Sequence, residues 1–225
     1  MELSSPQLSR SDTNLEKLNT EVVRSNEIPF PERVFNLLLG LSIISWAVLG
    51  LVSNEHPRPL TVRICIAALH IAVAIFILIR TGVRTNGSIQ ACLVALPAVV
   101  IGGWVFAFSP PVWNTTAQAV MVVGTVVSIT SVCWLGKSFS ILPSVRQLVC
   151  SGPYRWIRHP IYLGELLMCA GCCLAEVRWQ SLLIIIVAIV LVAARIVAEE
   201  KLLGSDNQYL AYQAKVKWRL IPMIW

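Results

Sequence analysis

The stretch TNGSIQACLVALPAVVIGGWVFAFSPPVWNTTAQAVMVVGTVVSITSVCWLG, residues 85–136, contains no Asp, Glu, Lys or Arg. A helix crosses the hydrocarbon layer of a membrane with about 20 apolar residues, so this stretch is long enough for two crossings. Ser109-Pro110-Pro111 and Asn114-Thr115-Thr116 are turn-forming residues that divide it. We therefore expect two membrane helices, over residues 89–108 and 117–136.

Four further apolar segments flank this stretch, at residues 34–53, 60–79, 160–175 and 179–194. The segment 160–175 is short and contains Glu165, and only a tight turn separates it from the last one, so these two are expected to form a helical hairpin. Only 13% of the chain is charged and 56% is hydrophobic, whereas a soluble globular chain carries about 25% charged residues. The predicted fold class is all-α: a polytopic membrane helix bundle of about six spans.

The basic residues divide unevenly between the two sides of this six-span topology. With both termini on one side, the other side holds only Arg58, Arg63 and Arg178, 3 of the 18 Lys and Arg residues. Lys and Arg gather in cytoplasmic loops, so we expect the termini, the loop 137–159 and the C-terminal tail in the cytoplasm. The net charge of +6 is then a signal of topology, and no nucleic-acid partner is expected.

Three regions follow from this topology. Residues 1–30 are polar and lack the basic start and short apolar core of a secretory signal, so we expect a flexible cytoplasmic extension. Residues 31–136 are expected to form a four-span membrane region. Residues 137–225 hold the hairpin and a tail, Leu202–Trp225, that is rich in aromatic and basic residues and is expected to lie on the membrane surface as an amphipathic segment.

The seven cysteines do not indicate a metal site. The run Cys169-Ala170-Gly171-Cys172-Cys173 has a spacing seen in metal and redox sites, but no histidine or further cysteine cluster completes a zinc ligand set. We interpret these residues as small side chains that let two membrane helices pack closely, and we expect no metal.

Polar residues near the membrane gather in two places, 137–165 and 195–200. Ionisable groups in membrane segments are costly and mark functional sites. Pro160 suits the first position of a helix, which puts His159 at a helix start, where backbone N–H groups bind anions. Interfacial anchoring accounts for Arg155, Trp156 and Arg158 as single residues, but it does not account for the run Arg-His-Pro-x-Tyr-x-Gly at residues 158–164.

The second polar cluster lies at the end of the last span. Arg195 and Glu199 are four residues apart, so they share one face of a helix. They either pair with each other at the membrane edge or share a polar pocket with the segment 146–162. Their expected position beside that segment favours the pocket.

Several short motifs occur together in the last part of the chain. They are Leu148-Val149, SGPYRWIRHPIYLG at residues 151–164, Arg195-x-x-x-Glu199-Glu200, Tyr209-x-x-Tyr212 and Ile221-Pro222. Together they resemble the isoprenylcysteine carboxyl methyltransferase family, which consists of integral membrane enzymes that use S-adenosyl-L-methionine. The resemblance covers residues 134–225, and the first four spans match only in hydrophobic character.

The resemblance implies a catalytic region at 137–225 and roles for individual residues. The cofactor site would comprise Gln147, Leu148, Val149, Tyr154, His159, Pro160, Ile161, Tyr162 and Glu199, and the catalytic residues would be Arg195, Glu199 and His159. Arg195 would hold the substrate, a carboxylate on a lipidated or lipophilic acceptor within the membrane lipid. A carboxylate is ionised at neutral pH, so its methylation needs no general base.

One position departs from the family. Eukaryotic members usually have histidine where this chain has Gln147, and several carry a longer acidic run after Glu200. The acceptor is therefore expected to differ, and a bacterial inner membrane is favoured over an endoplasmic reticulum.

Three other classes of protein remain as alternatives. Phospholipid N-methyltransferases share the Arg-x-Pro-x-Tyr and Glu-Glu patterns, but an amine must lose a proton, so His159 or a glutamate would have to act as a base. Sterol-type reductases that bind NADPH share Gly164-Glu165 but have asparagine where this chain has Ile161, and Glu199-Glu200 fits the methyltransferases better. A non-catalytic partner or transporter is disfavoured because the first, third and fourth spans hold no ionisable group.

Overall fold

The computed structural model describes residues 30–52, 58–79, 85–86, 93, 97, 110–139, 144–145 and 148–225. The N-terminal extension, nearly all of the expected span 89–108, and Gln147 lie outside these residues.

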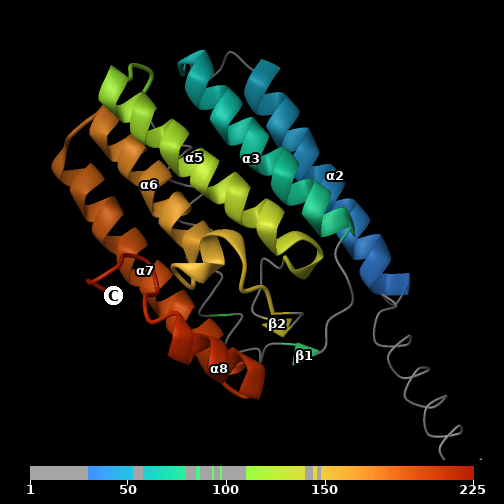
Figure 1. Ribbon diagram of the computed structural model, residues 1–225. Helices are drawn as coiled ribbons and strands as arrows, with labels where there is room; N and C mark the ends of the chain where they lie inside the picture. Colours follow the sequence, from blue (N-terminus) through green and yellow to red (C-terminus); the bar gives the residue numbers. More distant parts are fainter. Residues whose placement is uncertain are drawn as a thin grey trace, which may run out of the picture.

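The described part of the chain forms a bundle of long helices: α2 (Phe30–Val52), α3 (Leu60–Ile79), α5 (Thr115–Leu135), α6 (Pro160–Ala175) and α7 (Trp179–Leu203). In Figure 1, α2 and α3 lie at one edge of the bundle, α5 and α6 follow, and α7 lies at the other edge. Within the described residues, α2, α3, α5 and α7 are long and apolar enough to cross a membrane, and α6 is a shorter apolar helix. The predicted all-α membrane helix bundle is confirmed, and the count of six spans stays a prediction.

The helices begin where the sequence supplies local signals. The side chain of Asn114 accepts a hydrogen bond of 2.8 Å from the N–H of Ala117, which caps the start of α5. Pro160 occupies the first turn of α6, where its missing N–H costs nothing. Helix α7 ends at Leu203, and after a short break Asp206 caps the helix α8 (Asn207–Lys215) through the N–H of Gln208.

The remaining elements lie at one end of the bundle. Two short strands, β1 (Thr85–Asn86) and β2 (Ser144–Val145), pair antiparallel, and two short 3-10 helices cover Gly136–Ser138 (η1) and Gly152–Arg155 (η2). Figure 1 shows the strands and α8 at the lower end, where α6 begins and α7 finishes. The loops that precede α6 and follow α7 are thus at the same end.

Helices α5 and α6 pack through small residues. A Cβ atom added to Gly164 would lie 2.2 Å from the Oγ of Ser128 and 2.7 Å from the carbonyl oxygen of Gly124. A Cβ added to Gly124 would lie 2.8 Å from the carbonyl oxygen of Gly164. Each glycine therefore allows the backbone of the other helix to approach, as is typical of helix contacts within a membrane.

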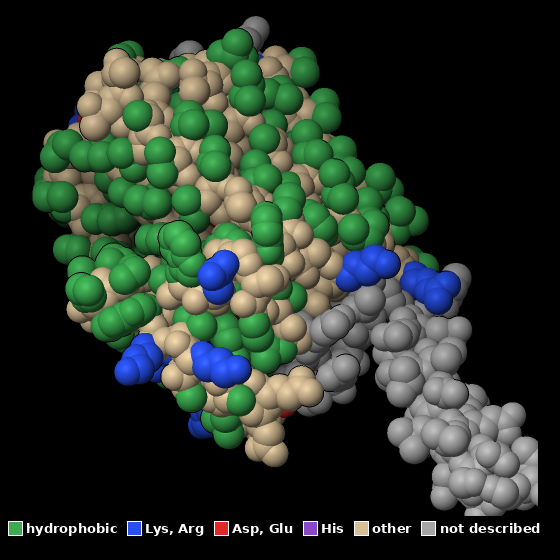
Figure 2. Space-filling view, in the orientation of Figure 1, with side chains coloured by type: hydrophobic (Ala, Val, Ile, Leu, Met, Phe, Trp, Pro, Cys, Tyr) green, Lys and Arg blue, Asp and Glu red, His purple; other side chains and the backbone are tan. Residues whose placement is uncertain are grey.

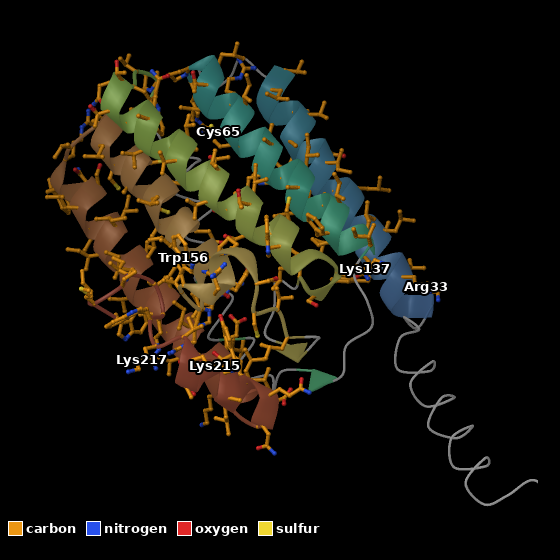
Figure 3. The ribbon with its side chains drawn as sticks, in the orientation of Figure 1. Arg33, Cys65, Lys137, Trp156, Lys215 and Lys217 are labelled. Carbon is orange, nitrogen blue, oxygen red and sulfur yellow. The ribbon has the colours of Figure 1, made fainter. Side chains whose placement is uncertain are left out.

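The outer surfaces of the helices are apolar. Trp46 and Val52 of α2 and Leu182, Ile186 and Val190 of α7 are all exposed. Figure 2 shows hydrophobic side chains over much of the visible face, with most of the visible Lys and Arg side chains in its lower half. In Figure 3 the labelled Arg33, Lys137, Lys215 and Lys217 lie toward this same end. An apolar belt with basic residues at one end is the surface expected of a membrane protein.

Candidate active site

The start of helix α6 presents backbone donors that have no partner within the helix. His159 is the residue before the helix, and its side chain does not cap the helix. Pro160 has no N–H, so the N–H groups of Ile161 and Tyr162 are the first donors of the helix. The first N–H groups of a helix lack partners within it and favour an anion. This end of α6 therefore suits the carboxylate of a ligand.

Tyr162 connects α6 with α7. Its hydroxyl donates a hydrogen bond of 2.5 Å to Oε2 of Glu199, and its ring stacks on that of His159 with 5.5 Å between the ring centroids. The guanidinium carbon of Arg195 lies 4.8 Å from the centroid of the Tyr162 ring, a distance that allows a cation–π interaction. Tyr162 thus gathers three of the predicted site residues around it.

Arg195 and Glu199 both face Tyr162, so the geometry favours a shared polar site over an isolated ion pair at the membrane edge. Arg195 is buried, with 6% of its surface exposed, and Glu199 is half-buried. The two residues present a cation and a carboxylate to the same region. This pair can recognise a ligand that carries both an acceptor and a donor group.

Glu200 is the centre of an ionic cluster that we did not predict from the sequence. Its Oε1 accepts hydrogen bonds from Nε of Arg158 at 2.8 Å and from Nε2 of His159 at 3.0 Å, and its Oε2 accepts one from Nε of Arg219 at 2.9 Å. Glu200, Arg158 and His159 are all buried. Arg158 is therefore not the interfacial anchor that we expected, whereas Trp156 remains exposed at 71%.

The C-terminal segment pairs with the residues just before α6. The N–H groups of Arg158 and His159 donate to the carbonyl oxygens of Trp218 and Arg219, both at 2.9 Å. Nη1 of Arg158 donates to two more carbonyl oxygens of this segment, those of Val216 and Lys217. The segment after α8 thus lies directly against the candidate site, although some 60 residues separate it from Arg158 along the chain.

Two tyrosines use their hydroxyls to hold this end of the bundle together. Tyr154 donates to the carbonyl oxygen of Ser131 on α5 at 3.3 Å, and Tyr212 donates to the carbonyl oxygen of Tyr154 at 2.6 Å. Burial raises the pKa of both hydroxyls, and nearby acidic groups add to the shift. Both therefore stay protonated and act as donors at neutral pH.

Tyr209 differs from these two. It is 3% exposed, and its hydroxyl has no hydrogen-bond partner within the described part of the chain. Burial raises its pKa, and the charge of Glu200 raises it further. Leu148 packs against the cluster of Tyr209, Tyr212 and Val216. A buried polar atom without a partner is rare in proteins and needs an explanation, so Tyr209 joins the candidate site.

The structure thus assembles most of the predicted residues at one end of the bundle. His159, Pro160, Ile161 and Tyr162 begin α6, and Arg195 and Glu199 face them from α7. Tyr154 lies in η2, Leu148 and Val149 precede it, and Gln147 is outside the described residues. Glu200, Arg219 and Tyr209 were not predicted as site residues. Glu200 and Tyr209 nevertheless belong to the motifs Arg195-x-x-x-Glu199-Glu200 and Tyr209-x-x-Tyr212.

Among the described residues, no group of three or more His, Cys, Asp or Glu side chains could hold a metal ion. The cysteines described, which are Cys65, Cys133, Cys150, Cys169, Cys172 and Cys173, are all free thiols.

Comparison with known families identifies the relationship. Residues 113–206, from just before α5 to just after α7, match the phospholipid methyltransferase family. This segment is similar to the phospholipid methyltransferases. It contains His159, Tyr162, Arg195 and Glu199, and the predicted relationship with membrane methyltransferases is thereby confirmed.

The chain also shows a partial likeness to a solved structure. A structure of the eukaryotic intramembrane Ras methyltransferase, isoprenylcysteine carboxyl methyltransferase, is similar over 96% of this chain and 88% of that one, with 19% sequence identity and a TM-score of 0.49. No curated protein matches the chain.

Proposed function

We propose that this protein is a membrane-embedded methyltransferase that uses S-adenosyl-L-methionine to methylate a carboxylate on a lipophilic or prenylated acceptor. The observation that carries the proposal is the meeting of His159, Tyr162, Arg195 and Glu199 at one end of α6 and α7, within the segment related to methyltransferases. Residues 137–225 would form the catalytic region.

The groups present fit the cofactor. The first N–H groups of α6 suit its carboxylate, Glu199 can accept from its amino or hydroxyl groups, and the buried hydroxyl of Tyr209 is available as a further partner. Tyr162 holds the Glu199 carboxylate in one orientation through the bond of 2.5 Å. Leu148 and Val149 supply apolar surface nearby. When bound, S-adenosyl-L-methionine supplies a methyl group already activated by its sulfonium.

Arg195 is the residue proposed to hold the acceptor. A guanidinium can bind a carboxylate through two parallel hydrogen bonds, which fixes both its position and its orientation. The acceptor carboxylate is ionised at neutral pH, so it needs alignment with the methyl group and no proton removal. Alignment alone supplies a large share of the rate enhancement in such transfers.

The lipid part of the acceptor would lie among the apolar helix surfaces, and the cofactor would enter at the end of the bundle that carries Lys215 and Lys217 (Figure 3). Because basic residues gather in cytoplasmic loops, we assign this end to the cytoplasm. A bacterial inner membrane is the favoured location.

A second candidate is the N-methylation of a phospholipid amine, because the matching family is that of the phospholipid methyltransferases. An amine acceptor must lose a proton before it attacks, and His159 or Glu199 would have to remove it. Arg195 makes this reaction less favourable, since a buried guanidinium repels an ammonium group. The carboxylate therefore remains the preferred acceptor.

Calorimetry on the purified protein in detergent tests the cofactor. We expect S-adenosyl-L-methionine to bind, the variants Glu199→Ala and His159→Ala to lose binding, and the variant Lys201→Gln to bind as the wild type does. Lys201 is exposed and adjacent on the same helix, which makes it a matched control. Binding of NADPH in place of the cofactor would indicate a reductase and overturn the proposal.

A labelling experiment then identifies the acceptor. The protein is given cofactor with a labelled methyl group, together with either total membrane lipid or a farnesylated cysteine analogue. A methyl ester releases its label as methanol in base, whereas an N-methylated lipid keeps it. Base-stable label in lipid would replace the first candidate by the second.

A further inference from the structure

We propose that Glu200 is a positioning residue that fastens the C-terminal segment 216–225 across the start of α6 and thereby fixes the ring of His159. The contacts that fasten the segment are independent of the proposed methyltransferase activity. Only the consequence for cofactor binding rests on that activity.

The carboxylate of Glu200 joins three parts of the chain that are distant in sequence. It receives Arg158 and His159 from the start of α6 and Arg219 from the C-terminal segment, at 2.8, 3.0 and 2.9 Å. Glu200 itself lies near the end of α7. Arg158 and His159 are each 7% exposed and Glu200 is 8% exposed, so the carboxylate can be buried only because all three donors are present.

Arg158 extends the same connection to the backbone of the segment. While its Nε bonds to Glu200, its Nη1 donates to the carbonyl oxygens of Val216 and Lys217 at 2.8 and 2.9 Å. Its backbone N–H donates to the carbonyl oxygen of Trp218. One buried side chain thus holds the helix α7 and the C-terminal segment together.

Arg219 is fixed through both its backbone and its side chain. Its carbonyl oxygen accepts from the N–H of His159, and its guanidinium reaches Glu200 while lying 5.0 Å from the ring of Trp225. The N–H groups of Arg219 and Leu220 both donate to the backbone oxygen of Trp225. Residues 219–225 therefore fold back on themselves beside Glu200.

The consequence for His159 concerns its two ring nitrogens. A carboxylate only accepts hydrogen bonds, so the contact with Glu200 keeps a proton on Nε2. Nδ1 makes no hydrogen bond within the described residues and is the nitrogen that a ligand can contact. Stacking on Tyr162 then fixes the plane of the ring. Glu200 can in this way control the site without touching the ligand.

The adjacent carboxylate has a different task. Glu199 faces Tyr162, whereas Glu200 faces Arg158, His159 and Arg219. Successive residues of a helix point about 100° apart, which follows from 3.6 residues per turn. Glu199 and Glu200 are thus expected to respond differently to substitution.

Limited proteolysis of the full chain in detergent tests the fastening. Trypsin cleaves after Lys215, Lys217 and Arg219. Glu200→Gln replaces one carboxylate oxygen by an NH2 group, which cannot accept a hydrogen bond and faces at least one guanidinium donor. The segment should therefore be released, and cleavage should be at least tenfold faster. The variant Lys201→Gln should be cleaved at these sites like the wild type, and Glu200→Asp, which keeps the charge, should lie between the two. Unchanged cleavage in Glu200→Gln would overturn the proposal.

Calorimetry with S-adenosyl-L-methionine tests the consequence for His159. We expect Glu200→Gln to weaken binding at least tenfold, with Glu200→Asp restoring most of the affinity. A merely structural role would lower the fraction of protein that binds and leave the dissociation constant unchanged. Wild-type affinity in Glu200→Gln would therefore refute the positioning role. If the wild type itself does not bind, the proposed function fails, and the proteolysis alone decides whether Glu200 fastens the segment.

Discussion

Helix α6 meets its two neighbours in opposite ways. Toward α5 it uses small residues, with Gly164 against Gly124 and Ser128. At its start it uses hydrogen bonds and charges, which connect Tyr162 to Glu199 and His159 to Glu200. Charged groups are costly in the hydrocarbon layer, so close packing serves there, and the polar contacts gather at the end of the helix. Along one short helix, the close contact with α5 is thus separate from the polar contacts of the candidate site.

The largest effect is expected at the glycine contact. Gly164→Ala places a methyl group 2.2 Å from Ser128 Oγ and 2.7 Å from backbone atoms of α5, so the two helices have to move apart. Overpacking costs about 1–3 kcal/mol and occasionally more, and we expect a cost above about 3 kcal/mol here, because the backbone on both sides leaves little room for relaxation. We expect a clear loss of thermal stability in detergent and a lower yield of monodisperse protein.

The control for this variant is Gly50→Ala in α2, where an added Cβ atom would meet nothing within 4 Å. Alanine is favoured over glycine in a helix by about 1 kcal/mol, so this variant should be at least as stable as the wild type. Equal stability of Gly164→Ala and Gly50→Ala would show that close packing does not hold α5 and α6 together.

The sequence predicts the bounds of the apolar helices well. Helices α3 and α6 have the expected bounds, 60–79 and 160–175, because charged residues and prolines delimit these apolar runs. Helix α7 continues past the apolar segment 179–194 to Leu203, as the helical spacing of Arg195 and Glu199 predicts. Hydropathy contains no information about the partners of Glu200 in other elements.

The polar part is predicted only where the spacing is local. The spacing of four residues predicts that Arg195 and Glu199 share a helix face, and both face Tyr162 of α6. The role of Glu200 depends on a chain end that folds back over the start of α6. No spacing in the sequence indicates that return.

The next largest effect is expected at Arg195, on the acceptor side of the site. Arg195→Lys keeps the charge but loses the fork of donors that binds a carboxylate in two places. We expect the kcat/KM for the acceptor to fall about 100-fold, which corresponds to roughly 2.7 kcal/mol. The affinity for S-adenosyl-L-methionine should change much less.

Steady-state kinetics with each substrate varied separately measures both quantities. An equal loss of affinity for the cofactor would place Arg195 in the cofactor site and leave the acceptor without an assigned cation. Either result shows which of the two ligands Arg195 binds.

A smaller effect is expected at Tyr162. Tyr162→Phe keeps the ring that stacks on His159 and lies beside Arg195, but it removes the hydroxyl that donates to Glu199 at 2.5 Å. A hydrogen bond to a charged group contributes about 1.5–3 kcal/mol. We expect the dissociation constant of the cofactor to rise about tenfold, with the helix packing intact. Unchanged binding in calorimetry would show that Glu199 needs no orientation by Tyr162.

The smallest effect concerns the pH dependence of stability, to which Tyr209 and Tyr212 both contribute. Burial raises the pKa of Tyr209 and Tyr212, so the folded protein keeps both protonated where the unfolded chain begins to release its protons. An unfolded tyrosine has a pKa of about 10. The stability that these groups contribute is therefore complete below this pH and declines as the pH rises above it. Either substitution by phenylalanine should make the alkaline decline shallower.

At neutral pH the two variants should differ, because only one hydroxyl has a partner. Tyr212→Phe loses the bond of 2.6 Å to the carbonyl oxygen of Tyr154 and leaves a buried acceptor unsatisfied, which costs about 1–3 kcal/mol. Tyr209→Phe removes a hydroxyl without a partner among the described residues, so its stability should be unchanged or higher, while the affinity for the cofactor falls several-fold. Thermal unfolding between pH 7 and about pH 11, with calorimetry at pH 7, measures both properties. A loss of stability in Tyr209→Phe equal to that in Tyr212→Phe would mean that this hydroxyl serves the fold, and Tyr209 would leave the candidate site.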